Sequence, residues 1–346
     1  MGKANKILTM GILLIAILLL FFLNLILGSV SIPIEQVWNV CIGNEADNVI
    51  WQNIILKSRL PQTITALLAG AGLAISGLQM QTVFRNPLAG PSVLGISSGA
   101  SLGVAFVVLL SGSIGGVALS KMGVIGELAL TTSAIGGAMA VMTLIAFVSQ
   151  KVKGNVTLLI IGVMIGYISN AVIGVLKFFS VEEDIKAYVI WGLGSFSRVS
   201  TEQLMPFVVS MLVLIPLSFL LIKTLNLLLL GDSYARSLGL NIKRARLFVI
   251  TSAGMLVAIV TAYCGPIIFL GLAVPHLSRT VFRTSDHKTL MPASLLIGAA
   301  MALVCNLIAR MPGFEGALPI NSVTALIGAP IVISVLFGRR KGEIAE

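Results

Sequence analysis

The side chains of this sequence that could carry out chemistry are few and scattered. Three cysteines and two histidines occur in 346 residues, and Cys41, Cys264 and Cys305 match neither a disulfide framework nor a metal-ligand spacing. His276 lacks a second ligand at metal-binding spacing, so we interpret it as a packed, hydrogen-bonded residue. We therefore expect no catalytic residue, no metal site and no cofactor.

Nucleotide-binding motifs are also missing or misplaced. The sequence has no Gly-x4-Gly-Lys-Ser/Thr loop, so we do not expect the chain to be an enzyme that hydrolyses ATP. The glycine-rich run at 70–77 resembles a dinucleotide loop, but it lies inside an apolar stretch with no strand before it. Small residues at helical spacing, as at Gly99 and Gly103, let helices pack closely in lipid. We interpret these glycines as packing residues.

The elements that must position any functional residue are ten apolar stretches with few or no charges. A bilayer core needs about 20 apolar residues per helix. Unpaired backbone amides are costly in hydrocarbon, so each stretch is predicted to be a transmembrane helix. The predicted spans are residues 7–27, 60–84, 93–110, 128–148, 156–176, 204–222, 247–264, 266–282, 290–308 and 320–337.

The charges between the spans fix the predicted orientation. With the amino terminus inside, 16 of the 23 Lys and Arg residues fall on the inner side, whereas nine of the 13 acidic residues fall outside. This positive-inside bias predicts that both termini lie in the cytoplasm. The net charge of +10 is then a property of an inner membrane face and does not indicate nucleic-acid binding.

Two Gly-Pro breaks occur at similar places in the two halves. Gly90-Pro91 precedes the third span, and Gly265-Pro266 opens the eighth. Proline interrupts helical hydrogen bonding, and inverted repeats with broken helices are typical of transporters. The predicted fold is therefore an all-α, polytopic membrane protein with ten transmembrane helices in two inverted five-helix halves, with residues 1–346 as one transmembrane domain.

The missing charges also bear on the energy source. Secondary transporters carry ionisable residues at mid-membrane, and an intramembrane enzyme needs a catalytic cluster. The predicted spans have neither: Lys177, Lys223 and Arg279 lie near span ends, where long side chains reach the interface. A large helical pore of this kind is expected to draw energy from a partner subunit.

Several motifs resemble one family in order and spacing. They are RLPQTITALLAGAGLAISGLQMQTVFRNPLAGPSVLGISSGASLG at 59–103, ARSLGL at 235–240, GPIIFLGLAVPHLSR at 265–279, DHK at 286–288 and LPINSVTALIGAPIVISVLF at 318–337. The family is that of the permease subunits of binding-protein-dependent ABC importers for ferric siderophores, haem and cobalamin. The resemblance implies a homodimer in the bacterial cytoplasmic (inner) membrane, two cytoplasmic ATPase subunits and an extracytoplasmic binding protein.

The resemblance assigns expected roles to residues at both membrane faces. The inner loop 231–246 resembles a coupling element of two short helices joined at Gly239, although its basic residues also obey the positive-inside rule. Arg59 and Arg310, on the outer side, resemble residues that meet glutamates of the binding protein; the alternative is ordinary interfacial anchoring. The residues expected to contact the ATPase are Ala235, Arg236, Leu238 and Gly239.

Three further assignments rest on position in the chain more than on a sequence motif. Gly154-Asn155 resembles the cytoplasmic gate by position, but relatives often have Ser or Thr there. The segment 181–200 resembles the short helix that closes the outer mouth, and its Trp191 is alternatively an interfacial belt residue. Polar residues near the first break either line the passage or satisfy freed backbone groups. These polar residues are Asn86, Ser97 and Ser98.

The substrate is the least determined property. In importers of this kind affinity resides in the binding protein, so the permease has little reason to display substrate chemistry. An iron(III)-siderophore complex is the expected cargo, with cobalamin (vitamin B12) or haem as the alternative.

Overall fold

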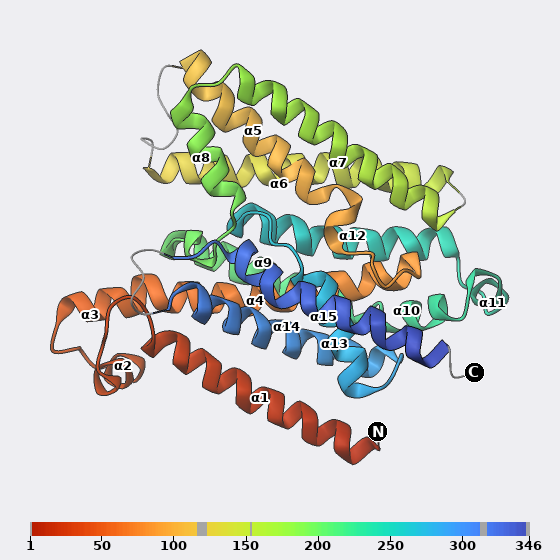
Figure 1. Cartoon of the computed structure of the whole chain (residues 1–346), viewed down its shortest axis with the longest axis horizontal. Coiled ribbons are helices and arrows are strands. Elements are labelled where there is room, and N and C mark those ends of the chain that lie inside the picture. The colour runs from red at the N-terminus through yellow and green to blue at the C-terminus, as the bar shows by residue number, and fades with distance from the viewer. Residues whose placement is uncertain (1, 116–122, 153, 312–316, 344–346) are drawn as a thin grey trace. The chain divides into compact units, whose positions relative to one another are not determined.

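A computed structural model describes residues 2–115, 123–152, 154–311 and 317–343, and every regular element within these ranges is helical. A helix forms at each of the ten predicted spans. These helices are α1 (Lys3–Ile26), α4 (Leu60–Phe84), α5 (Ile96–Gly115), α6 (Gly123–Lys151), α7 (Asn155–Phe178), α9 (Thr201–Phe219), α12 (Ile242–Cys264), α13 (Leu270–Phe282), α14 (His287–Ala309) and α15 (Ile320–Glu343) (Figure 1).

Seven helical segments of the described residues are long and apolar enough to cross a membrane by length and composition. The described parts of α5 and α15 give shorter apolar helices, and α13 has 13 residues. The all-helical polytopic prediction is thus confirmed for the described residues, whereas the count of ten spans stays a prediction.

Shorter helices occupy the connections between the predicted spans, including the short helices expected within 181–200 and 231–246. The stretch between the first two predicted spans is largely helical, as is most of 181–200. These elements are α2 (Ile34–Cys41), α3 (Val49–Ile54), the π-helical turn η1 (Ile55–Arg59), the 3₁₀ turn η2 (Pro91–Leu94), α8 (Glu182–Gly192), the 3₁₀ turn η4 (Phe196–Arg198), α10 (Ile222–Leu229) and α11 (Asp232–Ser237).

The eighth predicted span begins later than expected. The predicted boundary was residue 266, but α13 begins at Leu270. Gly265 has a φ of +77° and Phe269 a φ of +68°, so the backbone cannot be helical there. The Ile268 N–H instead donates to Asn321 Oδ1 at 3.0 Å. The break at Gly265-Pro266 is confirmed, and a side chain on α15 satisfies part of the backbone that it frees.

The chain divides into two compact units. Unit 1 comprises Met1–Ala74, Ser195–Leu212 and Ile268–Glu346, and unit 2 comprises Ile75–Gly194 and Val213–Ile267. Each unit draws on both predicted five-helix halves: unit 1 holds α1 together with α13–α15, and unit 2 holds α5–α7 together with α12. The compact units therefore do not coincide with the predicted halves, and the inverted repeat stays a prediction.

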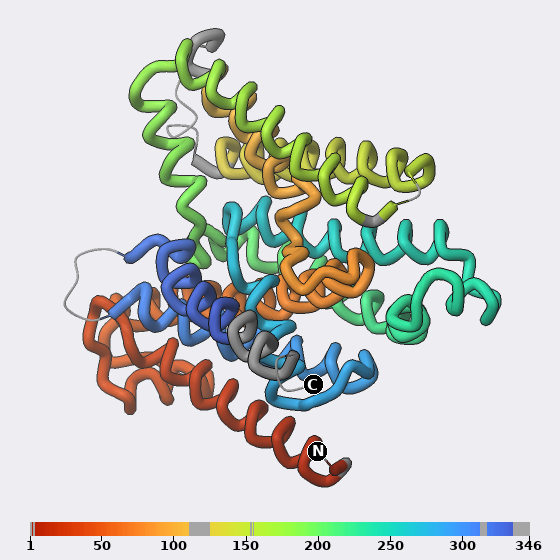
Figure 2. Tube along the Cα trace, turned by 45° about the vertical axis from the view of Figure 1, so that its right-hand side comes forward, coloured from red at the N-terminus to blue at the C-terminus, as the bar shows by residue number. Residues whose placement is uncertain are grey.

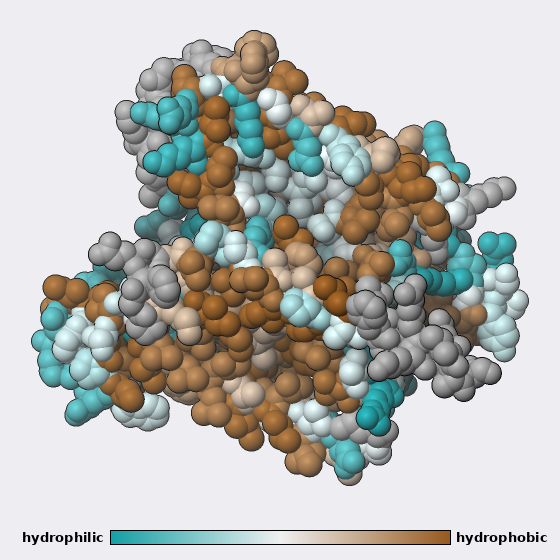
Figure 3. All heavy atoms as spheres, viewed as in Figure 1, coloured by the Kyte–Doolittle hydropathy of each residue, from teal (hydrophilic) through white to brown (hydrophobic). Residues whose placement is uncertain are grey.

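In unit 1, α1 packs on α14, which also packs on α13 and α15. A buried amide network fastens this contact. Asn306 Nδ2 donates to Asn24 Oδ1 at 2.8 Å, Asn24 Nδ2 donates to the Leu303 carbonyl at 3.2 Å, and Gln62 Nε2 donates to Asn306 Oδ1 at 2.8 Å. Much of the rest of α1 exposes apolar side chains, seen as the brown surface along this helix (Figure 3).

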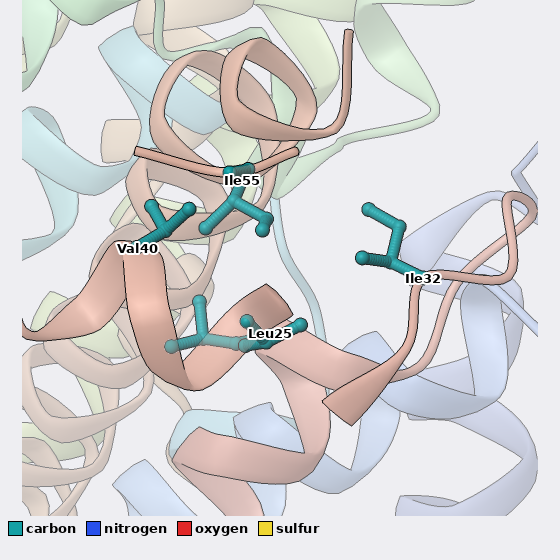
Figure 4. Close-up of a cluster of buried hydrophobic side chains, with 6 residues drawn as sticks. Leu25, Ile32, Val40 and Ile55 are labelled. Atoms are coloured by element: carbon teal, nitrogen blue, oxygen red, sulfur yellow. The ribbon is translucent and has the colours of Figure 1, made fainter. Parts of the chain in front are cut away.

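The end of α1 opposite the amino terminus is closed by a small apolar cluster. Leu25 and Ile32 meet Val40 of α2 and Ile55 of η1 (Figure 4). Removing such side chains from water is favourable, so this cluster holds α2 and η1 against the end of α1. It also fixes the position of Arg59, the last residue of η1.

In unit 2, α5 packs on α6, α7 and α8, and α12 packs on α6 (Figure 2). The α5–α6 contact brings backbone against backbone. A Cβ atom placed on Gly103 would overlap the Ser133 carbonyl, and one on Gly99 would lie 2.6 Å from the Gly137 carbonyl oxygen. The packing role predicted for Gly99 and Gly103 is confirmed.

Candidate functional site

The inner loop forms the predicted helix–turn–helix. The Leu240 N–H donates to the Ala235 carbonyl at 3.0 Å, and the Gly239 N–H donates to the Arg236 carbonyl at 2.9 Å. Gly239 has a φ of +85°, which glycine adopts without steric cost. The turn at Gly239 is confirmed, but the second helix is not a separate short element. It is the first part of α12, whose start is capped by Asn241.

The exposure of this loop fits a docking surface. Arg236, Leu238 and Gly239 are exposed, whereas Ala235 is fully buried and anchors α11. Leu238 exposes 56% of its surface and neighbours Tyr234, which exposes 62%. An apolar surface at a turn outside the apolar spans is typical of a contact with a protein partner. The ATPase contact itself stays a prediction.

Sequence reasoning did not identify Asp232, the first residue of α11. Its carboxylate accepts a hydrogen bond from Arg85 Nη2 at 2.6 Å and another from Arg246 Nη2. Arg85 follows α4 directly, and Arg246 lies near the start of α12. The available signal was charge pattern, because Asp232 is the one acidic residue of a loop that also holds Arg236, Lys243, Arg244 and Arg246.

On the predicted outer side, Arg59 lies in an unexpected place. Its side chain is 1% exposed, which corrects our expectation of an exposed docking residue. Nη1 donates to the carbonyls of Leu25 at 2.8 Å and Ile26 at 2.6 Å, and Nη2 donates to the Val30 carbonyl. The carbonyls at the end of a helix lack intrahelical partners. Arg59 therefore caps the end of α1, and its burial follows from this.

Arg310 lies beside Arg59. A Cβ atom on Gly28 would lie 3.0 Å from Arg59 Nη2 and 3.2 Å from Arg310 Nη2, so the two guanidinium groups flank this glycine. Burial lowers the pKa of Arg310 from its ordinary value. Arg59 Nε and Arg310 Nη1 are buried without a hydrogen-bond partner in the described part of the chain. The pair thus keeps donors that no described residue satisfies.

The residues near the first break have local partners. Asn86 Oδ1 accepts a hydrogen bond from the Leu88 N–H at 2.9 Å, and Ser97 Oγ lies 3.4 Å from Thr261 Oγ1. Ser98 is half-buried and faces Gly166 of α7. These contacts favour the structural reading, while a role in lining the passage stays a prediction.

Two further predicted positions have different outcomes. Gly154 is exposed and precedes α7, whereas the Asn155 side chain lies outside the described part of the structure, so the gate stays a prediction. Trp191 of α8 is 1% exposed and packs beside Tyr188, with ring centroids 6.3 Å apart. This burial does not fit a belt residue, which would expose its ring to the interface.

Apolar helices with breaks at Gly-Pro pairs, and a helix–turn–helix made of α11 and the start of α12, define an α-helical membrane protein of the transporter type. A family model for the FecCD transport family matches residues 15–338, and the chain belongs to this family of ABC-importer permeases.

The similar proteins span nearly the whole chain. The hemin transport system permease protein HmuU of Yersinia pestis is 34% identical, with 98% of each chain covered. The vitamin B12 import system permease protein BtuC of Klebsiella pneumoniae is 36% identical over 84% of each chain, and the molybdate import system permease protein MolB of Haemophilus influenzae is 33% identical over 94%. A solved ABC transporter assigned to the metal-chelate type, in an inward-facing conformation, is 31% identical with a TM-score of 0.81, covering 95% of this chain and 99% of that one.

Proposed function

We propose that this chain forms the translocation pathway for an iron(III)-siderophore complex in a binding-protein-dependent ABC importer. The observation that supports a chelated metal as cargo is the full-length likeness to the metal-chelate transporter, at a TM-score of 0.81.

The proposed complex has two copies of this chain, two cytoplasmic ATPase subunits and one binding protein. The inner loop 231–246 docks on the ATPase, and Arg310 faces the binding protein. ATP hydrolysis takes place in the partner subunit, and both termini lie in the cytoplasm. Native mass spectrometry of the complex should give two copies of this chain, and a transport-competent complex with one copy would contradict the homodimer.

The test of substrate is uptake into proteoliposomes that hold the complex with its cognate binding protein. The panel is a ferric hydroxamate, a ferric catecholate, hemin, cyanocobalamin and molybdate, each radiolabelled. ATP-dependent uptake of a ferric chelate is the expected result. A matched preparation without ATPase subunits should neither take up any substrate nor hydrolyse ATP. ATP hydrolysis by this chain alone would contradict the assignment of hydrolysis to the partner subunit.

Hemin is the second candidate, because the relative that covers 98% of the chain is a hemin permease. Uptake of hemin but of neither siderophore would favour it, and uptake of cyanocobalamin would indicate a vitamin B12 importer. Uptake of molybdate alone would reject a chelated metal as cargo.

A further inference from the structure

The inner end of α4 carries an unusual arginine. Arg85 follows Phe84 directly and has a φ of +46°, a conformation that glycine usually supplies where helices end. The Arg85 N–H donates to the Thr82 carbonyl and the Asn86 N–H to the Gln81 carbonyl, so the backbone at this position is fixed to α4. An arginine in place of a glycine adds a long, charged side chain at the end of the helix.

That side chain reaches the inner loop. Arg85 Nη2 lies 2.6 Å from Asp232 Oδ1, and the preceding Gly231, with a φ of +103°, passes close to Arg85. The other Asp232 oxygen pairs with Arg246, whose side chain is 12% exposed. One carboxylate therefore joins the end of α4, the start of α11 and the start of α12, all within unit 2.

We propose that Asp232 is a positioning residue that links the ATPase-docking loop to the inner end of α4 through Arg85. A displacement of α11 is then passed to α4 and to Asn86, which follows Arg85. The inference rests on the proposed function, since it assumes that an ATPase moves this loop. Asp232 makes two ion pairs while three side chains are ordered, whereas two separate pairs would order four side chains, which suits a link of this kind.

The first test measures the link without transport. Amide hydrogen exchange is followed at residues 232–240 in the purified full-length chain. Asp232→Asn should speed exchange there, because the loop loses both arginine anchors. Arg244→Gln, which removes an exposed arginine from the same loop, should leave exchange as in the wild type. Unchanged exchange in Asp232→Asn would overturn the link.

The second test uses Arg85→Gly in the complex with ATPase and binding protein. Glycine suits the backbone at this position, so the melting temperature should stay near that of the wild type. Stimulation of ATP hydrolysis by the loaded binding protein should fall by about two- to thirty-fold, the range known for mutations along a coupling route. Wild-type stimulation in Arg85→Gly would overturn the proposal.

The double variant Arg85→Gly with Asp232→Asn tests whether the two residues act as one. The double variant should be no worse than the more severe single variant. Multiplicative losses would mean that Arg85 acts elsewhere and would also overturn the proposal. A wild-type complex that transports none of the panel would count against the proposed function, whereas the exchange experiment would still decide the link.

Discussion

Helix α4 has an arginine at each end, and the two are used in opposite ways. Arg59, before the helix, is buried and donates to neutral backbone carbonyls, with a second cation, Arg310, nearby. Arg85, after the helix, is 40% exposed and pairs with Asp232. No carboxylate pairs with Arg59 among the described residues, whereas Arg85 and Arg246 share the carboxylate of Asp232. At one end of α4 an arginine therefore caps a neighbouring helix, whereas at the other end an arginine joins α4 to the inner loop.

The largest effect is expected at Arg59. Arg59→Leu would leave the carbonyls of Leu25, Ile26 and Val30 without their donor, and the loss of several buried charged hydrogen bonds should cost about 3 kcal/mol or more. Thermal unfolding of the purified chain measures this cost. Arg59→Lys keeps the charge but loses the forked guanidinium group, so its melting temperature should lie between those of the wild type and Arg59→Leu. An unchanged melting temperature for Arg59→Leu would mean that these hydrogen bonds do not hold α1.

The next effect is expected in the inner loop at Gly239. Proline there would remove the N–H that donates to the Arg236 carbonyl and would force φ from +85° toward about −65°. Uptake should be lost while ATP hydrolysis by the partner subunit continues. Gly239→Ala is the milder control, because a left-handed alanine costs about 1–2 kcal/mol. Undiminished uptake by assembled Gly239→Pro would contradict the coupling role.

Arg310→Glu tests whether the arginine beside Arg59 takes part in docking of the binding protein. Reversal of both residues would mix docking with the structural role of Arg59, so Arg310 is the cleaner variant. Its Nη1 lacks a partner among the described residues, and a carboxylate of the binding protein would now meet a like charge. A cost of about 1.4 kcal/mol would weaken binding tenfold. Affinity is measured at low and high salt, and wild-type docking should weaken as salt is raised.

If Arg310→Glu binds as tightly as wild type at low salt, the docking surface lies elsewhere. Arg198→Glu, another predicted outer arginine, is the matched control and should bind normally.

The smallest effect is expected in a labelling experiment that tests on which side of the membrane α2 lies. Cys41 on α2 is exposed, whereas Cys264 and Cys305 are buried. A membrane-impermeant maleimide should label intact cells at Cys41, and Cys41→Ser should abolish labelling. Desolvation raises the pKa of the Cys41 thiol, so labelling should speed up as pH rises from about 7 to about 9 and the thiolate forms. Labelling only after permeabilisation would place α2 inside.

Sequence reasoning succeeded where local rules govern the backbone. The bilayer requires apolar helices of a certain length, so charge-free stretches predicted the helix positions well. Gly239 and the Gly265-Pro266 pair marked a turn and a break because few other residues suit those conformations. The close packing at Gly99 and Gly103 followed from residue size alone.

It failed where a partner comes from far along the chain. The burial of Arg59 depends on carbonyls at residues 25–30, and the late start of α13 depends on Asn321, 53 residues from Ile268. Asp232 was overlooked because its partner Arg85 lies 147 residues away in the sequence. A single acidic residue in a basic loop forms no motif from which that partner could be predicted.

The contact between α5 and α6 has a mechanical consequence. Where Gly99 and Gly103 meet residues 133–141, backbone lies against backbone and the Val141 side chain packs on Gly99, so a change of rotamer has little room to absorb a displacement. We expect the two helices to move together during a transport cycle. Bending is then expected at the ends of the α5–α6 pair, where the chain leaves helical geometry, as it does at Gly95 with a φ of +74°.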